Sequence, residues 1–184
     1  MDRSAAIERM VEADLARLSD CWSDARDAGE AVPALERVLA GSLGNAAERL
    51  FVIERTARGR FRFGVASDRV HLRLGFDASG REIADRAPWP ERVTTILERA
   101  SHNRACVELA VSAETTLGDD AHIAVYLLPV SRVRGENAGF IGFAHAHARS
   151  SDTLDEFGLI VRTRIVAAVL ARPESRQIAA GALA

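Results

Sequence analysis

Residues 49–66 read RLFVIERTARGRFRFGVA, and this stretch predicts a β-hairpin. An apolar segment and an alternating segment are separated by Ala57-Arg58-Gly59, a break typical of a hairpin turn. Because successive side chains of a strand point to opposite faces, we expect Phe61, Phe63 and Val65 on one face. The hairpin therefore presents an aromatic face.

Three further strands are expected in succession. Residues 105–115 and 122–130 alternate, and Gly118-Asp119-Asp120 between them is a strong turn signal. Residues 139–146 form another alternating run after a turn at residues 134–137. Strands joined by tight turns are antiparallel, so the pattern predicts an α+β fold and not a doubly wound α/β sheet.

Helical patterns occupy most of the remaining sequence. Residues 7–22 predict an amphipathic first helix, because their apolar residues recur at helical spacing. Residues 34–40, 67–74 and 88–103 predict shorter helical segments. Residues 152–172 predict a closing helix. Its apolar stripe would be Leu154, Phe157, Val161, Ile165 and Val169.

The segment GRFRFGVASDRVHLRLGFDASGR, residues 59–81, ends in a G-x-D-x-x-G-R motif. The motif residues are Gly75, Asp77, Gly80 and Arg81. Glycines suit a tight turn with positive φ, and an aspartate can accept hydrogen bonds from loop amides. The motif is therefore expected to stabilise a turn, with a ligand or partner contact for Asp77 or Arg81 as the alternative.

This segment resembles, without gaps, part of a PAS subfamily common in alphaproteobacteria. In that group an aromatic hairpin strand leads into a helix and then into this turn. The resemblance extends over residues 15–146 and includes Trp22 and Pro33, which match a tryptophan-ending helix followed by a proline. The sequence departs from the subfamily at Gly64 and Ser67-Asp68, where relatives usually have an arginine and a Gly-Thr pair.

The resemblance implies a PAS-like five-stranded antiparallel sheet with flanking helices at both ends. We expect an N-terminal helical extension over residues 1–42, a PAS-like sensory core over residues 43–148, a C-terminal helix over residues 149–172 and a flexible tail over residues 173–184. It also implies a role in signal transduction. A small ligand or a protein partner would shift the packing of the flanking helices, and another protein would read the changed surface.

PAS domains enclose a cavity between sheet and helices. The candidate lining residues in this sequence are Phe51, Phe61, Phe63, Trp89, Phe140 and Phe143. Such aromatic residues more often form a plain hydrophobic core, so both interpretations stay open. His71 is the candidate ligand if the cavity holds haem, because haem iron needs an axial ligand, but the sequence identifies no cofactor.

The first helix offers a stripe that must be covered. Leu15, Leu18 and Trp22 form this stripe. In PAS proteins such flanking helices commonly pair with a second copy, which implies a homodimer. Packing against the chain's own sheet is the alternative.

Composition excludes several function classes. All 24 basic residues are arginine, and a chain without lysine lacks the usual catalytic group of P-loop enzymes, protein kinases and Schiff-base enzymes. The sequence also contains no G-x-S-x-G, H-E-x-x-H or S-x-x-K motif. We therefore expect no enzymatic activity.

Charge and hydropathy indicate the compartment and exclude two kinds of partner. The formal net charge of −2, without a basic block, gives no reason to expect nucleic-acid binding. The sequence has neither an apolar run of about 20 residues nor a signal-peptide pattern, so we expect a cytoplasmic protein that does not enter the membrane.

Histidines provide the alternative function. His145 and His147 lie two residues apart on a predicted strand and therefore share a face, as two metal ligands would. His122 would be the third ligand if the strand register brings it alongside. This alternative is a small metal-binding protein or enzyme. The simpler interpretation is that His145 and His147 lie at the exposed end of the last strand and bind no metal.

Overall fold

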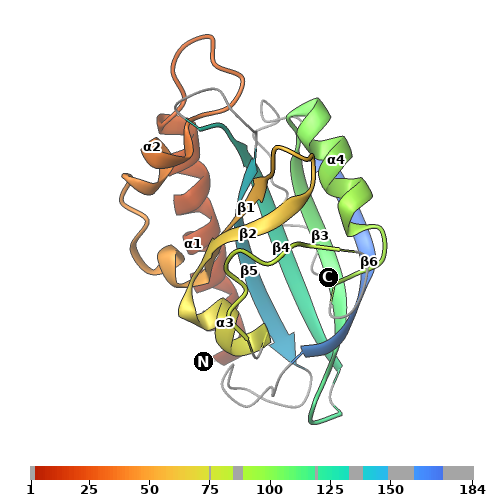
Figure 1. Ribbon diagram of the computed structural model, residues 1–184. Coiled ribbons are helices and arrows are strands. Elements are labelled where there is room, and N and C mark those ends of the chain that lie inside the picture. The colour runs from red at the N-terminus through yellow and green to blue at the C-terminus, as the bar shows by residue number, and fades with distance from the viewer. Residues whose placement is uncertain are drawn as a thin grey trace.

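The computed structural model describes residues 3–74, 76–84, 89–118, 120–132, 139–148 and 160–171. Its centre is a six-stranded antiparallel sheet with the strand order β2-β1-β5-β4-β3-β6 (Figure 1). The strands are β1 (Leu50–Arg55), β2 (Phe61–Ala66), β3 (Cys106–Thr115), β4 (Asp120–Val130), β5 (Gly139–Ala148) and β6 (Ile160–Ala171). The α+β class and the PAS-like antiparallel sheet are confirmed, although the sheet has six strands instead of five.

Helical segments precede the strands and connect them. They are α1 (Arg3–Asp24), α2 (Leu35–Leu39), the 3₁₀ helix η1 (Gly44–Arg49), α3 (Asp68–Leu74) and α4 (Val93–Asn103). The predicted helix over residues 88–103 starts only at Val93, because Arg92 has a left-handed backbone with φ of 64°. None of the described helices is long and apolar enough to cross a membrane.

The helix α1 covers one face of the sheet, here called the α1 face. Leu18 and Trp22 are buried there. The sheet side chains beneath the helix are Leu50, Val52, Ala124, Tyr126, Leu128, Ile141 and Phe143. The Trp22 indole donates a hydrogen bond of 2.7 Å from Nε1 to the buried carbonyl oxygen of Pro129. This bond satisfies a buried donor and ties α1 to the sheet.

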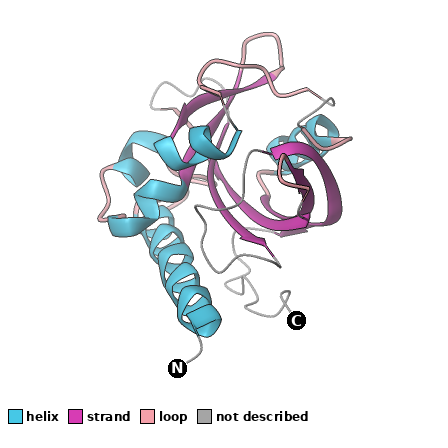
Figure 2. Cartoon of the chain, turned by 90° about the horizontal axis from the view of Figure 1, so that it is seen from below, coloured by secondary structure: helices cyan, strands magenta, loops and turns pink. Residues whose placement is uncertain are grey.

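The opposite face of the sheet, here called the cavity face, has its own hydrophobic cluster. It includes Phe51, Phe63, Leu109, Val111 and Leu127 from the strands and Val93 and Leu97 from α4. Figure 2 shows α1 and α4 on opposite sides of the curved strands. The sheet therefore separates two cores, one for each side of the molecule.

The predicted C-terminal helix over residues 149–172 is wrong in its described part. Residues 160–171 form β6, which pairs antiparallel with β3 along nearly its whole length. Six of these twelve residues are β-branched, a composition that favours a strand over a helix. Val161, Ile165 and Val169 recur every fourth residue, which produced the helical pattern, but the free edge of β3 provides a row of hydrogen-bond partners. Residues 149–159 and 172, and the predicted tail over residues 173–184, lie outside the described residues.

The hairpin of β1 and β2 is confirmed, with one correction at its end. The register shifts between Phe51 and Ile53, so that Phe51 lies opposite Ala66 and Ile53 lies opposite Phe63. The extra residue on β2 reverses the alternation beyond Phe63. Val65 is consequently 66% exposed, while Phe63 is buried as predicted.

Candidate functional site

A cavity of about 430 Å³ lies between the cavity face of the sheet and a cover made of α3, α4, Ile83, Trp89 and Pro90. Its walls are overwhelmingly apolar. Strand residues on the wall include Phe51, Phe63, Leu109, Val111, Ile123, Val125 and Ala144. Trp89, Val93 and Leu97 close it from the opposite side. The volume and the apolar lining are typical of sites for small molecules.

Three of the predicted aromatic residues, Phe51, Phe63 and Trp89, line this cavity. Phe63 and Trp89 both contribute to the wall, and their ring centroids are 5.1 Å apart. Phe61 and Phe140 pack against each other in the same core, 6.4 Å apart, and do not line the cavity. Phe143 lies on the α1 face, because it is one residue out of phase with Phe140 and Gly142 on β5.

Glycine makes room for part of the cavity wall. Gly142 of β5 lies opposite Phe51 of β1, and a Cβ at position 142 would lie 2.3 Å from the Phe51 ring. The ring therefore lies directly over the glycine. A larger residue at position 142 would push Phe51 out of this position.

Charged side chains meet the cavity at one corner. Arg49, at the end of η1, lines the cavity and forms an ion pair with Asp14 of α1 at 2.5 Å. Both side chains are deeply buried, with exposed fractions of 7% and 9%. Arg69 of α3 also lines the cavity and pairs with Glu48, the neighbour of Arg49 in sequence, at 3.0 Å.

The buried Asp14–Arg49 pair was missed at the sequence level, although a signal for it exists. Asp14 lies three residues after Val11 and four before Leu18, and therefore on the apolar stripe of α1. A carboxylate within an apolar stripe is seldom buried without a cationic partner. The sequence could not identify the partner, because Arg49 is 35 residues away.

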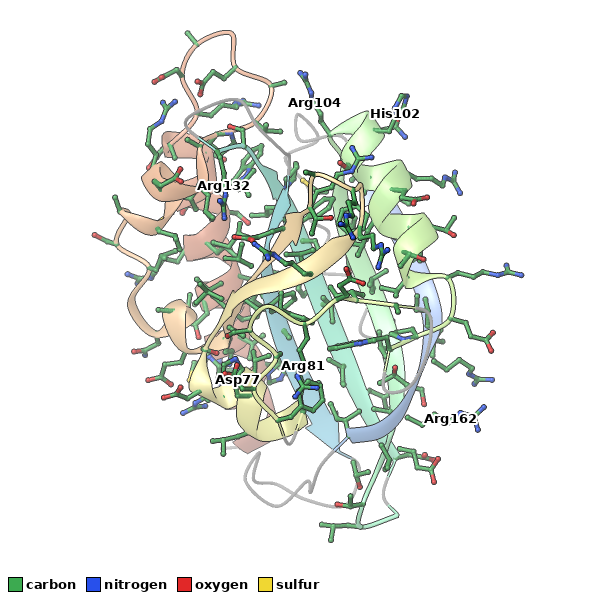
Figure 3. The ribbon with its side chains drawn as sticks, in the orientation of Figure 1. Asp77, Arg81, His102, Arg104, Arg132 and Arg162 are labelled. Carbon is green, nitrogen blue, oxygen red and sulfur yellow. The ribbon has the colours of Figure 1, made fainter. Side chains whose placement is uncertain are left out.

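The G-x-D-x-x-G-R motif forms a tight turn beside the cavity. Asp77 accepts a hydrogen bond of 2.8 Å from the Ser79 amide, and the Arg81 Nε donates a hydrogen bond of 3.0 Å to the Asp77 carbonyl oxygen. Gly80 has φ of +73°, as glycine in a turn allows, while Gly75 lies outside the described residues. The Ser79 hydrogen bonds, followed by the charges of His71 and Arg81, lower the pKa of Asp77. In Figure 3, Asp77 and Arg81 lie side by side above α3.

A chain of ring contacts connects this turn to the cavity. The Arg81 guanidinium lies 4.8 Å from the centroid of the Phe76 ring. Phe76 in turn contacts Trp89 edge to face, with centroids 6.4 Å apart, and Trp89 lines the cavity. The turn therefore supports the cavity wall from outside and does not itself contribute lining residues.

His71 lies between α3 and the turn. Its Nε2 is 3.5 Å from an Asp77 carboxylate oxygen, and the side chain is 23% exposed. It is absent from the cavity lining, although its helix neighbours Val70 and Leu72 line it. This position suits a contact between helix and turn better than an axial ligand within the cavity.

The strand register does bring the predicted histidines together in part. His122 lies opposite His147, and His145 lies opposite Ala124 in the same strand pair. His145 is only 3% exposed, so the expected exposed position is wrong for this residue. The side chain of His147 lies outside the described part of the structure. Among the side chains that are described, no group of three or more His, Cys, Asp or Glu residues could hold a metal ion.

The stripe predicted to form a dimer is used within the chain itself. Leu18 and Trp22 are 0% and 3% exposed, and Leu15 is partly buried against the same cluster. Of the two alternatives, packing against the chain's own sheet is the one that the structure contains. Its physical basis is the apolar α1 face, which would otherwise be open to water.

Comparison with known proteins agrees with this architecture. A family model described as PAS domain matches residues 10–145, which include most of α1, the strands β1 to β4, most of β5 and the cavity walls except those from β6. No curated protein matches the sequence. Because the family model covers most of the chain, this protein belongs to the PAS domain family.

Proposed function

We propose that this chain is a sensory PAS protein in signal transduction, which binds a small molecule in the cavity and transmits its presence through α1 to a protein partner. The observation that carries the proposal is the 430 Å³ apolar cavity within a PAS fold. A molecule bound in an apolar cavity of this size gains packing contacts with the walls and would stabilise the fold.

The connection from cavity to surface runs through the buried ion pair. Arg49 belongs to the cavity wall, and its partner Asp14 belongs to α1. A ligand that moves Arg49 would change the free energy with which α1 docks on the sheet. The exposed side of α1 is then the surface that a partner would read.

A non-enzymatic function is part of this proposal. None of the described residues that line the cavity is a carboxylate, a serine or a cysteine. Thr163 and His145 are the other polar residues among them, and strand alternation places the His145 side chain on the α1 face with Phe143. We place the protein in the cytoplasm, where Cys21 and Cys106 would remain free thiols.

The homodimer predicted from the sequence also remains a proposal. Because Leu18 and Trp22 are buried within one chain, a dimer would have to use another surface. Size-exclusion chromatography with light scattering would measure the mass of the particle directly.

The proposal is tested by native mass spectrometry and absorption spectroscopy of the purified protein. We expect a bound compound, or binding of a compound from an apolar panel. Ala144→Leu places a larger side chain in the cavity and should abolish binding, whereas the matched change Ala167→Leu, at an exposed position on β6, should preserve it. If the purified protein carries no small molecule and binds none from the panel, the sensory proposal is wrong. The protein is then an adaptor for protein contacts.

A metal-binding function is the second candidate, and the register of His122 opposite His147 favours it. Opposed residues on antiparallel strands have Cβ atoms about 5 Å apart, which is close enough for two ligands of one ion. Metal analysis of the purified protein and of a variant with both His122→Ala and His145→Ala tests this candidate. Equal metal content in the two proteins would eliminate it.

A further inference from the structure

The charge distribution on the cavity wall is one-sided. Two arginines, Arg49 and Arg69, line the cavity, and no Asp or Glu is found among the described lining residues. Asp14, the partner of Arg49, is buried and does not line the cavity, whereas Arg69 and its partner Glu48 are both more than half exposed. Arg49 is therefore the buried cation at one corner of a cavity whose other walls are mainly apolar.

Arg49 has unused hydrogen-bonding capacity. A guanidinium carries five N–H donors. Within the described residues, Arg49 makes one side-chain hydrogen bond, from Nη1 to Asp14. Its side chain is only 7% exposed, so bulk water has little access to the remaining donors. A ligand oxygen in the cavity is the natural acceptor for them.

The two arginines lie at the same end of the cavity. Arg49 ends η1, and Arg69 lies on α3, which packs against η1 and pairs with it through Glu48. At the other end the wall includes Leu97 of α4, and Figure 1 shows α3 and α4 over opposite ends of the sheet. A ligand that satisfies both ends has an acidic head and an apolar tail.

We infer that the cavity takes a monocarboxylic acid with an apolar tail, whose carboxylate binds the Arg49 guanidinium; this inference rests on the proposed ligand-binding function. The pair of Arg49 and Asp14 is neutral, so a second carboxylate leaves a net negative charge in a buried place. That excess charge weakens the bond between Arg49 and Asp14. Ligand binding thus loosens the attachment of α1, which supplies the signal.

The test compares two probes of equal tail length, decanoate and decanol, by isothermal titration calorimetry at pH 7.5. The quantity of interest is the ratio of their affinities. Arg49→Gln should lower the decanoate-to-decanol ratio about 10- to 100-fold, the value of a lost charge-assisted hydrogen bond. Asp14→Asn should raise the ratio, because it removes the competing carboxylate. Arg132→Gln is the matched control, since Arg132 pairs with Glu54 and does not line this cavity.

A second variant keeps the inference testable if Arg49→Gln does not fold. Asp14→Leu together with Arg49→Met replaces the buried pair by apolar side chains and should fold, as far-UV circular dichroism would show. It too should lose the preference for decanoate.

The outcomes distinguish the carboxylate inference from the proposed ligand-binding function on which it rests. If both probes bind and Arg49→Gln leaves their ratio unchanged, the carboxylate inference is wrong and the apolar cavity function stands. If neither probe binds, the inference is wrong, and a protein that also carries no endogenous compound contradicts the proposed function itself.

Discussion

Breaking the buried ion pair between α1 and the cavity wall is expected to destabilise the whole fold. Asp14→Ala leaves the Arg49 guanidinium without its counter-charge at a site where only 7% of the side chain is exposed. Removal of one partner of such a pair typically costs about 3–5 kcal/mol. In a chain of this size, the melting temperature falls by about 2–4 °C for each kcal/mol of lost stability. The expected decrease in the melting temperature is therefore about 6–20 °C.

Chemical denaturation in guanidinium chloride measures this cost. Far-UV circular dichroism follows the sheet, while tryptophan fluorescence reports on α1 through Trp22 and on the cavity wall through Trp89. The matched control is Arg60→Ala, which breaks an ion pair with Glu82 whose side chains are 58% and 51% exposed. Such surface pairs contribute about 0–1 kcal/mol.

The double variant Asp14→Leu with Arg49→Met identifies the cause of the loss. It should recover most of the stability, because apolar residues of similar volume avoid the desolvation of two charges. A loss below about 1 kcal/mol for Asp14→Ala, similar to that of the control, would show that the pair is hydrated in solution and does not connect α1 to the cavity.

Three further changes test other parts of the structure. Gly139→Ala places a Cβ 2.3 Å from the Ile53 carbonyl oxygen, so β1 and β5 must separate. The free energy of unfolding, measured in urea, should decrease by about 1–3 kcal/mol. An unchanged unfolding midpoint would mean that the strands are not so close. Burial raises the pKa of the Cys106 thiol to about 11. In the variant Cys21→Ser, alkylation of Cys106 by iodoacetamide at pH 8 should therefore be roughly 100-fold slower than that of an unperturbed thiol, and it should accelerate on unfolding. Rapid alkylation of the folded variant would contradict this burial. Gly142→Ala should displace the Phe51 ring and weaken the binding of decanol, as calorimetry would show, and undiminished affinity would refute the position assigned to the ring.

Local patterns were sufficient for most of the fold. The alternation in residues 105–115, 122–130 and 139–146 predicted three successive strands, and β3, β4 and β5 occur there. The aromatic hairpin and the amphipathic first helix were likewise identified correctly. Each of these elements buries one face, so the spacing of its apolar residues indicates which side of the element faces the core.

The sequence patterns predicted the wrong structure at two places, residues 160–171 and Val65. Val161, Ile165 and Val169 suggested a helix, yet residues 160–171 form β6 because the edge of β3 accepts a partner strand. Val65 was placed on the wrong face, because a bulge depends on pairing with β1 and leaves no mark in β2 alone. Both outcomes depend on hydrogen bonds between segments distant in sequence.

The sequence by itself determined the α+β class, the antiparallel strands and the PAS resemblance, because these properties follow from local periodicity and residue pattern. Only the tertiary structure decided which aromatic residues line the cavity. Phe63 and Trp89 do, whereas Phe143 lies on the other side of the sheet. The tertiary structure also brought Asp14 to Arg49 across 35 residues. A cavity and a buried ion pair arise from packing between elements, and sequence periodicity records only which side of each element is covered.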